Sequence, residues 1–206
     1  MGDSVPSEPA AAGAADIRTT GAWVHVLLSD DQGAEIAAAW SPPPDSELPT
    51  HPHVTLVYLW DDATSRLHRE DVEATIRDAL GEQAGDGTPA ATALPGVFNG
   101  LARFATDPVS GLVPVVATLD CPGLEALQAG LSAALEQAFG VEPPHGFVPH
   151  CTIAFAPFTD DDPVIFGAPP MTRITVTEVA LVWGNSLDAA NITRFPLAVP
   201  RAAPEW

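Results

Sequence analysis

A seven-residue segment occurs twice in this chain, at 52–58 and again at 149–155. The first copy reads PHVTLVY and the second PHCTIAF, so the order in both is proline, histidine, a small apolar residue, threonine, two aliphatic residues and an aromatic residue. Duplication places equivalent groups at equivalent positions of a fold. We therefore expect two strands that present the same side chains to a shared cleft.

The alternation of side chains along a strand separates each copy into a polar and an apolar face. The polar face carries His53 and Thr55 in the first copy and His150 and Thr152 in the second. The opposite face is expected to hold the apolar residues of both copies, which are Val54, Leu56, Tyr58, Cys151, Ile153 and Phe155. Proline at the start of each segment removes a ladder donor only where the strand begins. The apolar faces predict packing against helices, and the polar faces predict a wet cleft.

Two imidazoles and two hydroxyls suit the chemistry of a phosphodiester. A histidine with a pKa near 6.5 is neutral or protonated close to neutral pH, so one ring can remove a proton while the other supplies one. Threonine hydroxyls donate to the non-bridging phosphate oxygens as negative charge builds on them. We predict His53, Thr55, His150 and Thr152 as catalytic residues, with neither a metal nor a cofactor. The duplication leaves open which histidine is the acid and which is the base.

The hydrophobic pattern predicts a mixture of strands and helices. Strands are expected at 21–29, 53–59, 91–105, 112–119, 150–155, 173–183 and 192–199. Helices are expected at 30–40, 65–82 and 122–139. This order predicts the α+β class, with helices packed on mainly antiparallel sheets. Residues 1–20 and 200–206 are predicted to be tails around one domain at 21–199, a size that fits a single core.

The charge of the chain is strongly negative, with 27 acidic residues against 8 basic ones and a net charge of −19. All the basic residues are arginine. A long phosphate backbone is held through many basic contacts, so the composition disfavours long nucleic acid as a partner. A small nucleotide, or one RNA end with a cyclic phosphate, remains compatible with the composition. The acidic start of the chain does not fit a signal peptide, and the absence of a long apolar run predicts a cytoplasmic protein without a membrane span.

The segments HVTLVYL, from His53, and FVPHCTIAF, from Phe147, resemble the motifs of the 2H phosphoesterase superfamily. This superfamily includes bacterial 2′-5′ RNA ligase-like proteins and cyclic nucleotide phosphodiesterases. The resemblance covers 21–199 and implies a bilobal, pseudo-two-fold α+β fold, with two mainly antiparallel sheets flanked by helices around a central cleft. It also implies hydrolysis of 2′,3′-cyclic phosphate ends to 2′-phosphates, or a related reaction. We expect a monomeric, metal-independent phosphodiesterase that acts on 2′,3′-cyclic phosphates or on small cyclic nucleotides and oligonucleotides.

One departure from the superfamily concerns phosphate binding. Some relatives have a basic residue just after the second motif, where this chain has Ala154, Phe155 and Ala156. The departure motivates one alternative, a module that binds or sequesters a small nucleotide, as in phage counter-defence. A second alternative, an activity like that of a 2′-5′ RNA ligase, is disfavoured by this departure and by the acidic charge.

Further residues are candidates for binding or for metal ligation. Phe147 and Tyr58 are predicted to stack on a base, and Arg103 to contact phosphate. A metal site at His51, His53 and His150 is the weaker interpretation of the histidines, because no glutamate follows the first motif as in cupins. His25 is predicted to be a core histidine, and His68 and His145 to be surface residues, with an approach of His145 to the cleft left open. His51 is expected to flank the cleft. The two cysteines, Cys121 and Cys151, are predicted to be free thiols.

Overall fold

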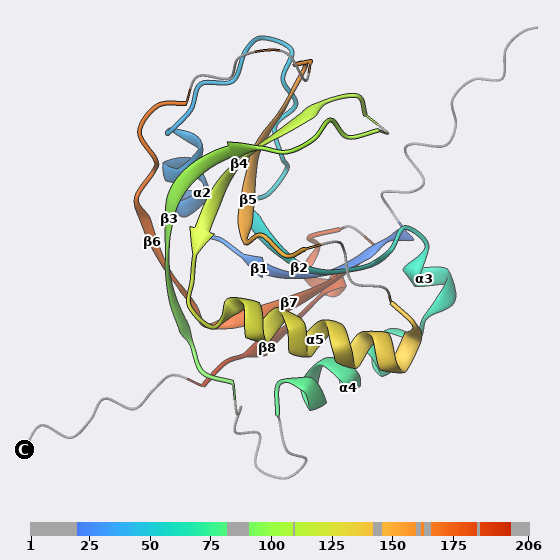
Figure 1. Ribbon diagram of the computed structural model, residues 1–206. Helices are drawn as coiled ribbons and strands as arrows, with labels where there is room; N and C mark the ends of the chain where they lie inside the picture. Colours follow the sequence, from blue (N-terminus) through green and yellow to red (C-terminus); the bar gives the residue numbers. More distant parts are fainter. Residues whose placement is uncertain are drawn as a thin grey trace, which may run out of the picture.

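The computed structural model describes residues 20–81, 91–108, 110–141, 146–159, 162, 166–184 and 186–198. Except for Thr20, the tails predicted at 1–20 and 200–206 lie outside these residues, as does His145. The described chain is an α+β fold built on one strongly curled sheet (Figure 1). In order along the chain the strands are β1 (Ala22–Leu27), β2 (His53–Trp60), β3 (Leu94–Arg103), β4 (Val113–Asp120), β5 (His150–Ala156), β6 (Thr172–Val176), β7 (Glu178–Trp183) and β8 (Ile192–Pro196).

The sheet has the order β6-β3-β4-β5-β2-β1-β7-β8, and every pair of neighbouring strands is antiparallel. The two strands that carry the repeated segment, β2 and β5, are neighbours at its centre. Each is paired with the strand that precedes it, and a helix joins the two strands of each pair. The first unit is β1-α2-β2 and the second is β4-α5-β5, so the two halves of the sheet repeat one another in topology.

Four α-helices and one short 3₁₀-helix are described: α2 (Asp30–Ala37), α3 (Ala63–Arg66), α4 (Arg69–Ala79), α5 (Leu124–Phe139) and η1 (Ala189–Asn191). The helix α2 begins with a capping box, in which Ser29 and Gln32 satisfy each other's backbone N–H groups. Helices α4 and α5 pack together on the β1-β2-β7-β8 half, whereas α2 packs against the other half near β6 (Figure 1). None of the described helices is long and apolar enough to cross a membrane.

One hydrophobic core joins the helices to the inner strands. On the motif strands the core takes up Val54 and Leu56 of β2 and Cys151 and Ile153 of β5. Burial of one large apolar side chain stabilises a fold by about 1.5–3 kcal/mol. The helices therefore hold the apolar faces of both motif strands in place and leave their other faces to the cleft.

Three predictions about the fold need correction. The expected two sheets are one, because β2 and β5 pair directly at Val54 and Cys151. The single strand predicted at 173–183 is two strands, since β6 pairs with β3 and β7 pairs with β1 after a break at Thr177. The helix predicted at 65–82 is α3 followed by α4, because Leu67 and His68 adopt extended backbone between them.

Candidate active site

A bulge occurs at the same place in both motif strands. The register between β1 and β2 shifts at Leu56, and the register between β4 and β5 shifts at Ile153. Each of these residues is the third after the motif histidine, His53 or His150. A β-bulge adds one unpaired residue and resets the alternation of side chains beyond it.

The bulges change which side chains share the face of the motif histidines. Tyr58 and Phe155 were expected on the apolar face, but each lies beyond its bulge and is only half-buried. Tyr58 pairs across the strands with Trp23, and their ring centroids are 5.5 Å apart. Phe155 lines the same cavity as Trp23 and His53. The motif aromatics therefore share the face of the histidines and threonines, and the expectation from simple alternation is wrong for both.

The pairing of the two motif strands sets the arrangement of the site. Val54 and Cys151, which form the described pair between β2 and β5, are the residues between His and Thr of each motif. The two strands run in opposite directions through this pair, so the histidine of each motif lies beside the threonine of the other. The structure thus brings the four predicted catalytic side chains to the middle of the sheet.

Both motif histidines make the same hydrogen bond through Nδ1. The acceptor is the backbone carbonyl two residues earlier, at 2.9 Å from His53 to His51 and at 2.6 Å from His150 to Val148. Because a carbonyl oxygen only accepts, Nδ1 carries the hydrogen and Nε2 is left to exchange protons. The acceptor residue precedes a proline in both cases, and a residue before proline is restricted to extended backbone. The proline of the motif thus helps to fix the tautomer of the histidine that follows it.

The surroundings of both rings disfavour their charged forms. Burial lowers the pKa of His53 below its usual range, the hydrogen bond to the carbonyl of His51 opposes this, and the nearby His150 and His51 lower it again. Burial also lowers the pKa of His150, against the hydrogen bond to Val148. The repulsion between His53 and His150 acts on both rings, but His51 adds a like charge at His53 alone, so a proton entering the pair favours His150.

A cavity of about 420 Å³ lies over this face of the sheet. We call it the cleft; its described lining comprises Trp23, His25, Leu27, Glu47, Leu48, Pro49, Thr50, His51, His53, Asp107, Ser110, Thr152, Phe155, Val182 and Leu187. Its volume falls in the range of small-molecule sites. His53 and Thr152 line it directly, whereas Thr55 and His150 are placed beside it by the pairing of β2 with β5.

His25 is a site residue that sequence reasoning placed in the core. Its side chain is 7% exposed, its ring stacks on that of His53 with centroids 4.2 Å apart, and it lines the cleft. Its Nε2 is buried and has no hydrogen-bond partner within the described chain. Burial, followed by the neighbouring His53, holds the pKa of His25 well below its usual range. Its position opposite Thr55 follows from the β1–β2 register, which the local sequence pattern does not contain.

The other predicted binding residues are spread over the fold. Phe147 packs against the hydrophobic core and is not among the described residues that line the cleft. Arg103, on β3, donates to the backbone carbonyls of Thr159, at 3.4 Å, and Asp162, at 2.9 Å, so its guanidinium holds a loop. The hydroxyl of Tyr58 donates to Asp61, and burial together with that carboxylate raises the pKa of the phenol.

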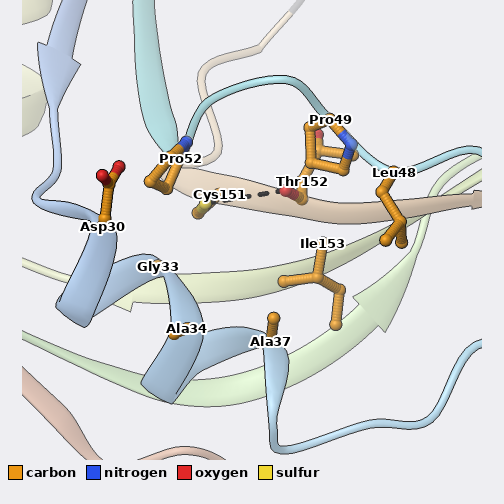
Figure 2. A pocket seen from close by; sticks show the side chains of 10 residues that line it. All are labelled: Asp30, Gly33, Ala34, Ala37, Leu48, Pro49, Pro52, Cys151, Thr152 and Ile153. Carbon is orange, nitrogen blue, oxygen red and sulfur yellow. Dashed lines mark hydrogen bonds between the residues drawn. The ribbon is translucent and has the colours of Figure 1, made fainter.

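A smaller, apolar pocket of about 210 Å³ lies on the α2 side of β5 (Figure 2). Cys151 and Ile153 point into it across from Gly33 and Ala34 of α2. The thiol of Cys151 contacts the carbonyl of Thr152 at 3.6 Å, and burial raises the pKa of Cys151 to about 11. Cys151 and Cys121 are both free, as predicted, and both are buried. Within the described ranges, no three His, Cys, Asp or Glu side chains converge as ligands for a metal ion.

Comparisons with known proteins agree with this architecture. A sequence model of the 2′-5′ RNA ligase superfamily matches residues 13–187. The crystal structure of TT0787 from Thermus thermophilus is 21% identical with a TM-score of 0.61, over 88% of this chain and all of that one. E. coli LigT complexed with 3′-AMP is 17% identical with a TM-score of 0.59, over 86% of this chain and 95% of its own. No curated protein matches this chain in sequence.

Proposed function

The chain belongs to the 2′-5′ RNA ligase superfamily, the 2H phosphoesterases, and on that premise we propose that it is a metal-independent phosphodiesterase for 2′,3′-cyclic phosphates or small cyclic nucleotides. The observation that carries this proposal is the matched pair of histidines, each with Nδ1 bonded to a carbonyl and Nε2 left for proton transfer. Proton transfer between such a pair and a substrate is general acid–base catalysis.

The reaction on a nucleoside 2′,3′-cyclic phosphate balances with these groups alone. The neutral Nε2 of one histidine takes a proton from water as the water oxygen bonds to phosphorus. The bond from phosphorus to the 3′ oxygen breaks, and the protonated Nε2 of the other histidine gives its proton to that oxygen. The product is a 2′-phosphate. The hydroxyls of Thr55 and Thr152 donate to the non-bridging oxygens, where charge develops.

The environments of the two rings favour His53 as the base and His150 as the acid. The repulsion between His53 and His150 acts on both rings, whereas His51 and His25 are further histidine neighbours of His53 and not of His150. When the pair holds one proton, that proton belongs on the ring with fewer like charges around it. His150 then enters the reaction protonated and His53 enters it neutral.

The cleft fits a small ligand better than a long one. Its volume of about 420 Å³ is that of a small-molecule site, and glutamate and aspartate line it without any described arginine. E. coli LigT, which shares the fold, has been crystallised with 3′-AMP, NADP⁺ and ATP. These complexes support a small nucleotide as the partner proposed for this chain.

The direct test is hydrolysis of adenosine 2′,3′-cyclic phosphate in the presence of EDTA, with product identified by phosphorus NMR. We expect adenosine 2′-phosphate from the wild type and a loss of about 10² to 10⁴-fold in rate in His53→Ala and His150→Ala. His68→Ala is the matched control, because His68 lies between α3 and α4. Activity that disappears with EDTA, or that survives both cleft substitutions, would overturn the proposal.

A second candidate is a module that binds a small nucleotide without turnover. The absence of arginine from the described lining favours it, because phosphate chemistry usually uses a fixed cation to stabilise the transition state. Calorimetry with mass analysis of the recovered ligand separates the two functions. Intact cyclic nucleotide indicates binding alone, and a linear phosphomonoester indicates catalysis. Joining of RNA ends, assayed separately with RNA as the substrate, would instead point to the ligase activity of the superfamily name.

A further inference from the structure

One wall of the cleft is a row of aromatic rings supplied by β1 and β2. The ring of His25 stacks on His53 at 4.2 Å between centroids, Trp23 follows His25 at 6.3 Å, and Tyr58 follows Trp23 at 5.5 Å. Trp23, His25 and His53 all line the cleft. The row therefore runs from a proposed catalytic imidazole to a large indole that has no part in the acid–base chemistry.

The position of the Trp23 indole is fixed by the residues around it. A Cβ atom at Gly21 would lie 2.4 Å from the Cη2 atom of the Trp23 ring, which is closer than real contacts allow. Glycine at this position leaves the space that the indole occupies. Tyr58 packs beside the same ring from the neighbouring strand, and its hydroxyl is tied to Asp61. The indole is thus positioned before any ligand arrives, which reduces the entropy lost on binding.

The charged residues of the cleft do not favour binding of an anionic ligand, so other contacts, such as those with this aromatic wall, have to contribute to affinity. Two carboxylate residues, Glu47 and Asp107, line the cleft, and none of the lining residues described is an arginine. A phosphate bound there gains hydroxyls and imidazoles but no fixed cation from those residues. Stacking of a base on an aromatic ring does not depend on a cation, because every base has a π face.

We propose that Trp23 is the platform for the nucleobase, so that the substrate class is a nucleoside cyclic phosphate with its base on Trp23 and its phosphate at the histidine pair. The ring centroids of Trp23 and His25 are 6.3 Å apart, and His25 in turn stacks on His53 at 4.2 Å. The indole is thus separated from the proposed catalytic imidazole by one ring, which the ribose of the nucleotide has to span. The proposal rests on the proposed function for the position of the phosphate.

A competing platform exists on the other half of the sheet. Phe155 occupies the position after the second bulge that Tyr58 occupies after the first, and it also lines the cleft. The residue paired with Phe155 on β4 is Pro114, whereas the residue paired with Tyr58 on β1 is Trp23. Phe155 therefore lines the cleft without an aromatic partner across the strands, whereas Trp23 is packed against Tyr58, and this difference favours Trp23.

The test compares a substrate that has a base with one that has none. Rates are measured for adenosine 2′,3′-cyclic phosphate and for glycerol 1,2-cyclic phosphate with the wild type, Trp23→Ala, Trp23→Phe and Phe155→Ala. We expect Trp23→Ala to lower kcat/KM for the adenosine substrate by about 5- to 150-fold, the range of one base stacked on one aromatic ring. Trp23→Phe retains a ring and should recover most of the loss. In both Trp23 variants the rate with the glycerol substrate should fall by less than the rate with the adenosine substrate, because glycerol cyclic phosphate makes no stacking contact.

Three outcomes overturn the base platform. The first is equal loss on both substrates in Trp23→Ala when Trp23→Phe also fails to recover, since that indicates a general structural effect. The second is no loss on either substrate. The third is a loss specific to adenosine in Phe155→Ala alone, which would move the platform to the second half of the sheet.

A binding measurement keeps this test separate from the proposed function. Adenosine 3′-monophosphate and inorganic phosphate are titrated by calorimetry, which requires no turnover. Weaker binding of the nucleotide in Trp23→Ala with unchanged binding of phosphate supports the platform even in a protein that hydrolyses nothing. Unchanged binding of both ligands overturns it, whatever the activity of the wild type.

Discussion

The two motif strands have the same internal geometry but different neighbours. β2 and β5 share a histidine bonded to a carbonyl, a threonine on the same face and a bulge after it. On the β1 side, His25 lies opposite the motif threonine, whereas the equivalent residue on β4 is Val116. The ring of His150 meets the edge of Phe104 at 4.6 Å, whereas His53 meets a second imidazole. A duplicated motif can thus place equal groups while its neighbours make them chemically unequal.

The largest loss of activity should come from substitution of the motif histidines, which both halves of the sheet contain. His53→Ala and His150→Ala each remove one partner of the proton transfer, so each should lower kcat by about 10² to 10⁴-fold. The double variant should lose little more than either single variant, because groups that act as a unit are not additive. Multiplicative losses in the double variant would show that the two histidines act independently. Steady-state kinetics on adenosine 2′,3′-cyclic phosphate gives the answer.

The threonines test whether both halves hold the phosphate. Thr55→Val and Thr152→Val keep the shape of the side chain and remove one donor, which in comparable sites costs about 10² to 10³-fold in kcat. We expect similar losses in the two variants, since each threonine lies beside the histidine of the other motif. A large loss in only one variant would place the phosphate on one half of the cleft.

The pKa values of the two motif histidines should differ in the order set by their neighbours. NMR titration of the free protein should find both values below the ordinary value of about 6.5, with His53 the lower of the two. His51→Gln should raise the pKa of His53 because it removes one like charge, and it should leave His150 unchanged. If His150 is the lower, the assignment of His53 as the base is wrong.

The extra histidine of the first half should also affect stability. A buried histidine with a lowered pKa stays neutral in the folded protein but binds a proton in the unfolded chain. Its contribution to the free energy of unfolding is therefore present above the unfolded pKa of about 6.5 and is lost as the pH falls below that value. His25 has its pKa held well below this range, and His53 and His150 act in the same direction. His25→Phe should therefore make the melting temperature less sensitive to acid. Thermal unfolding at a series of pH values measures this, and an unchanged slope contradicts it.

The smallest effect should come from the support under the aromatic wall. Gly21→Ala adds one methyl group where the Trp23 ring now lies, so the indole must shift. We expect weaker binding of adenosine 3′-monophosphate, by less than the loss in Trp23→Ala, and no change for phosphate. Gly130→Ala is the matched control, because a Cβ there meets no atom within 4 Å. Equal effects of the two alanine variants would show that the position of the indole does not matter.

Local patterns predicted most of the fold, and contacts between distant segments account for the errors. Seven strand ranges were placed correctly except that 173–183 contains two strands, β6 and β7. The break at Thr177 depends on pairing partners at opposite ends of the sheet order, which no local window contains. The single sheet likewise depends on one pair, Val54 and Cys151, between segments that are far apart in the chain.

The repeated segment identified the residues at the centre of the candidate site, but not what surrounds them. The positions of Tyr58 and Phe155 were predicted on the wrong face because bulges leave no signal in the hydrophobic pattern. His25 was predicted to be a core residue, which is correct for its burial and incomplete for its contact with His53. The apolar neighbours of His25 along β1 do not reveal which residues of β2 lie beside it. The contact with His53 on β2 is what makes His25 part of the candidate site.

The two bulges place side chains that are an odd number of residues apart on the same face of the sheet, which regular alternation would not do. His53 and Tyr58 are an odd number of residues apart, as are His150 and Phe155, yet both members of each pair lie on the same face of the sheet. In a regular strand an odd separation puts two side chains on opposite faces. The functional unit is therefore a six-residue segment from the histidine to the aromatic residue, in which the fourth residue is the unpaired residue of the bulge. Removing Leu56 or Ile153 would keep every named chemical group and still turn the aromatic residue of that half away from the ligand.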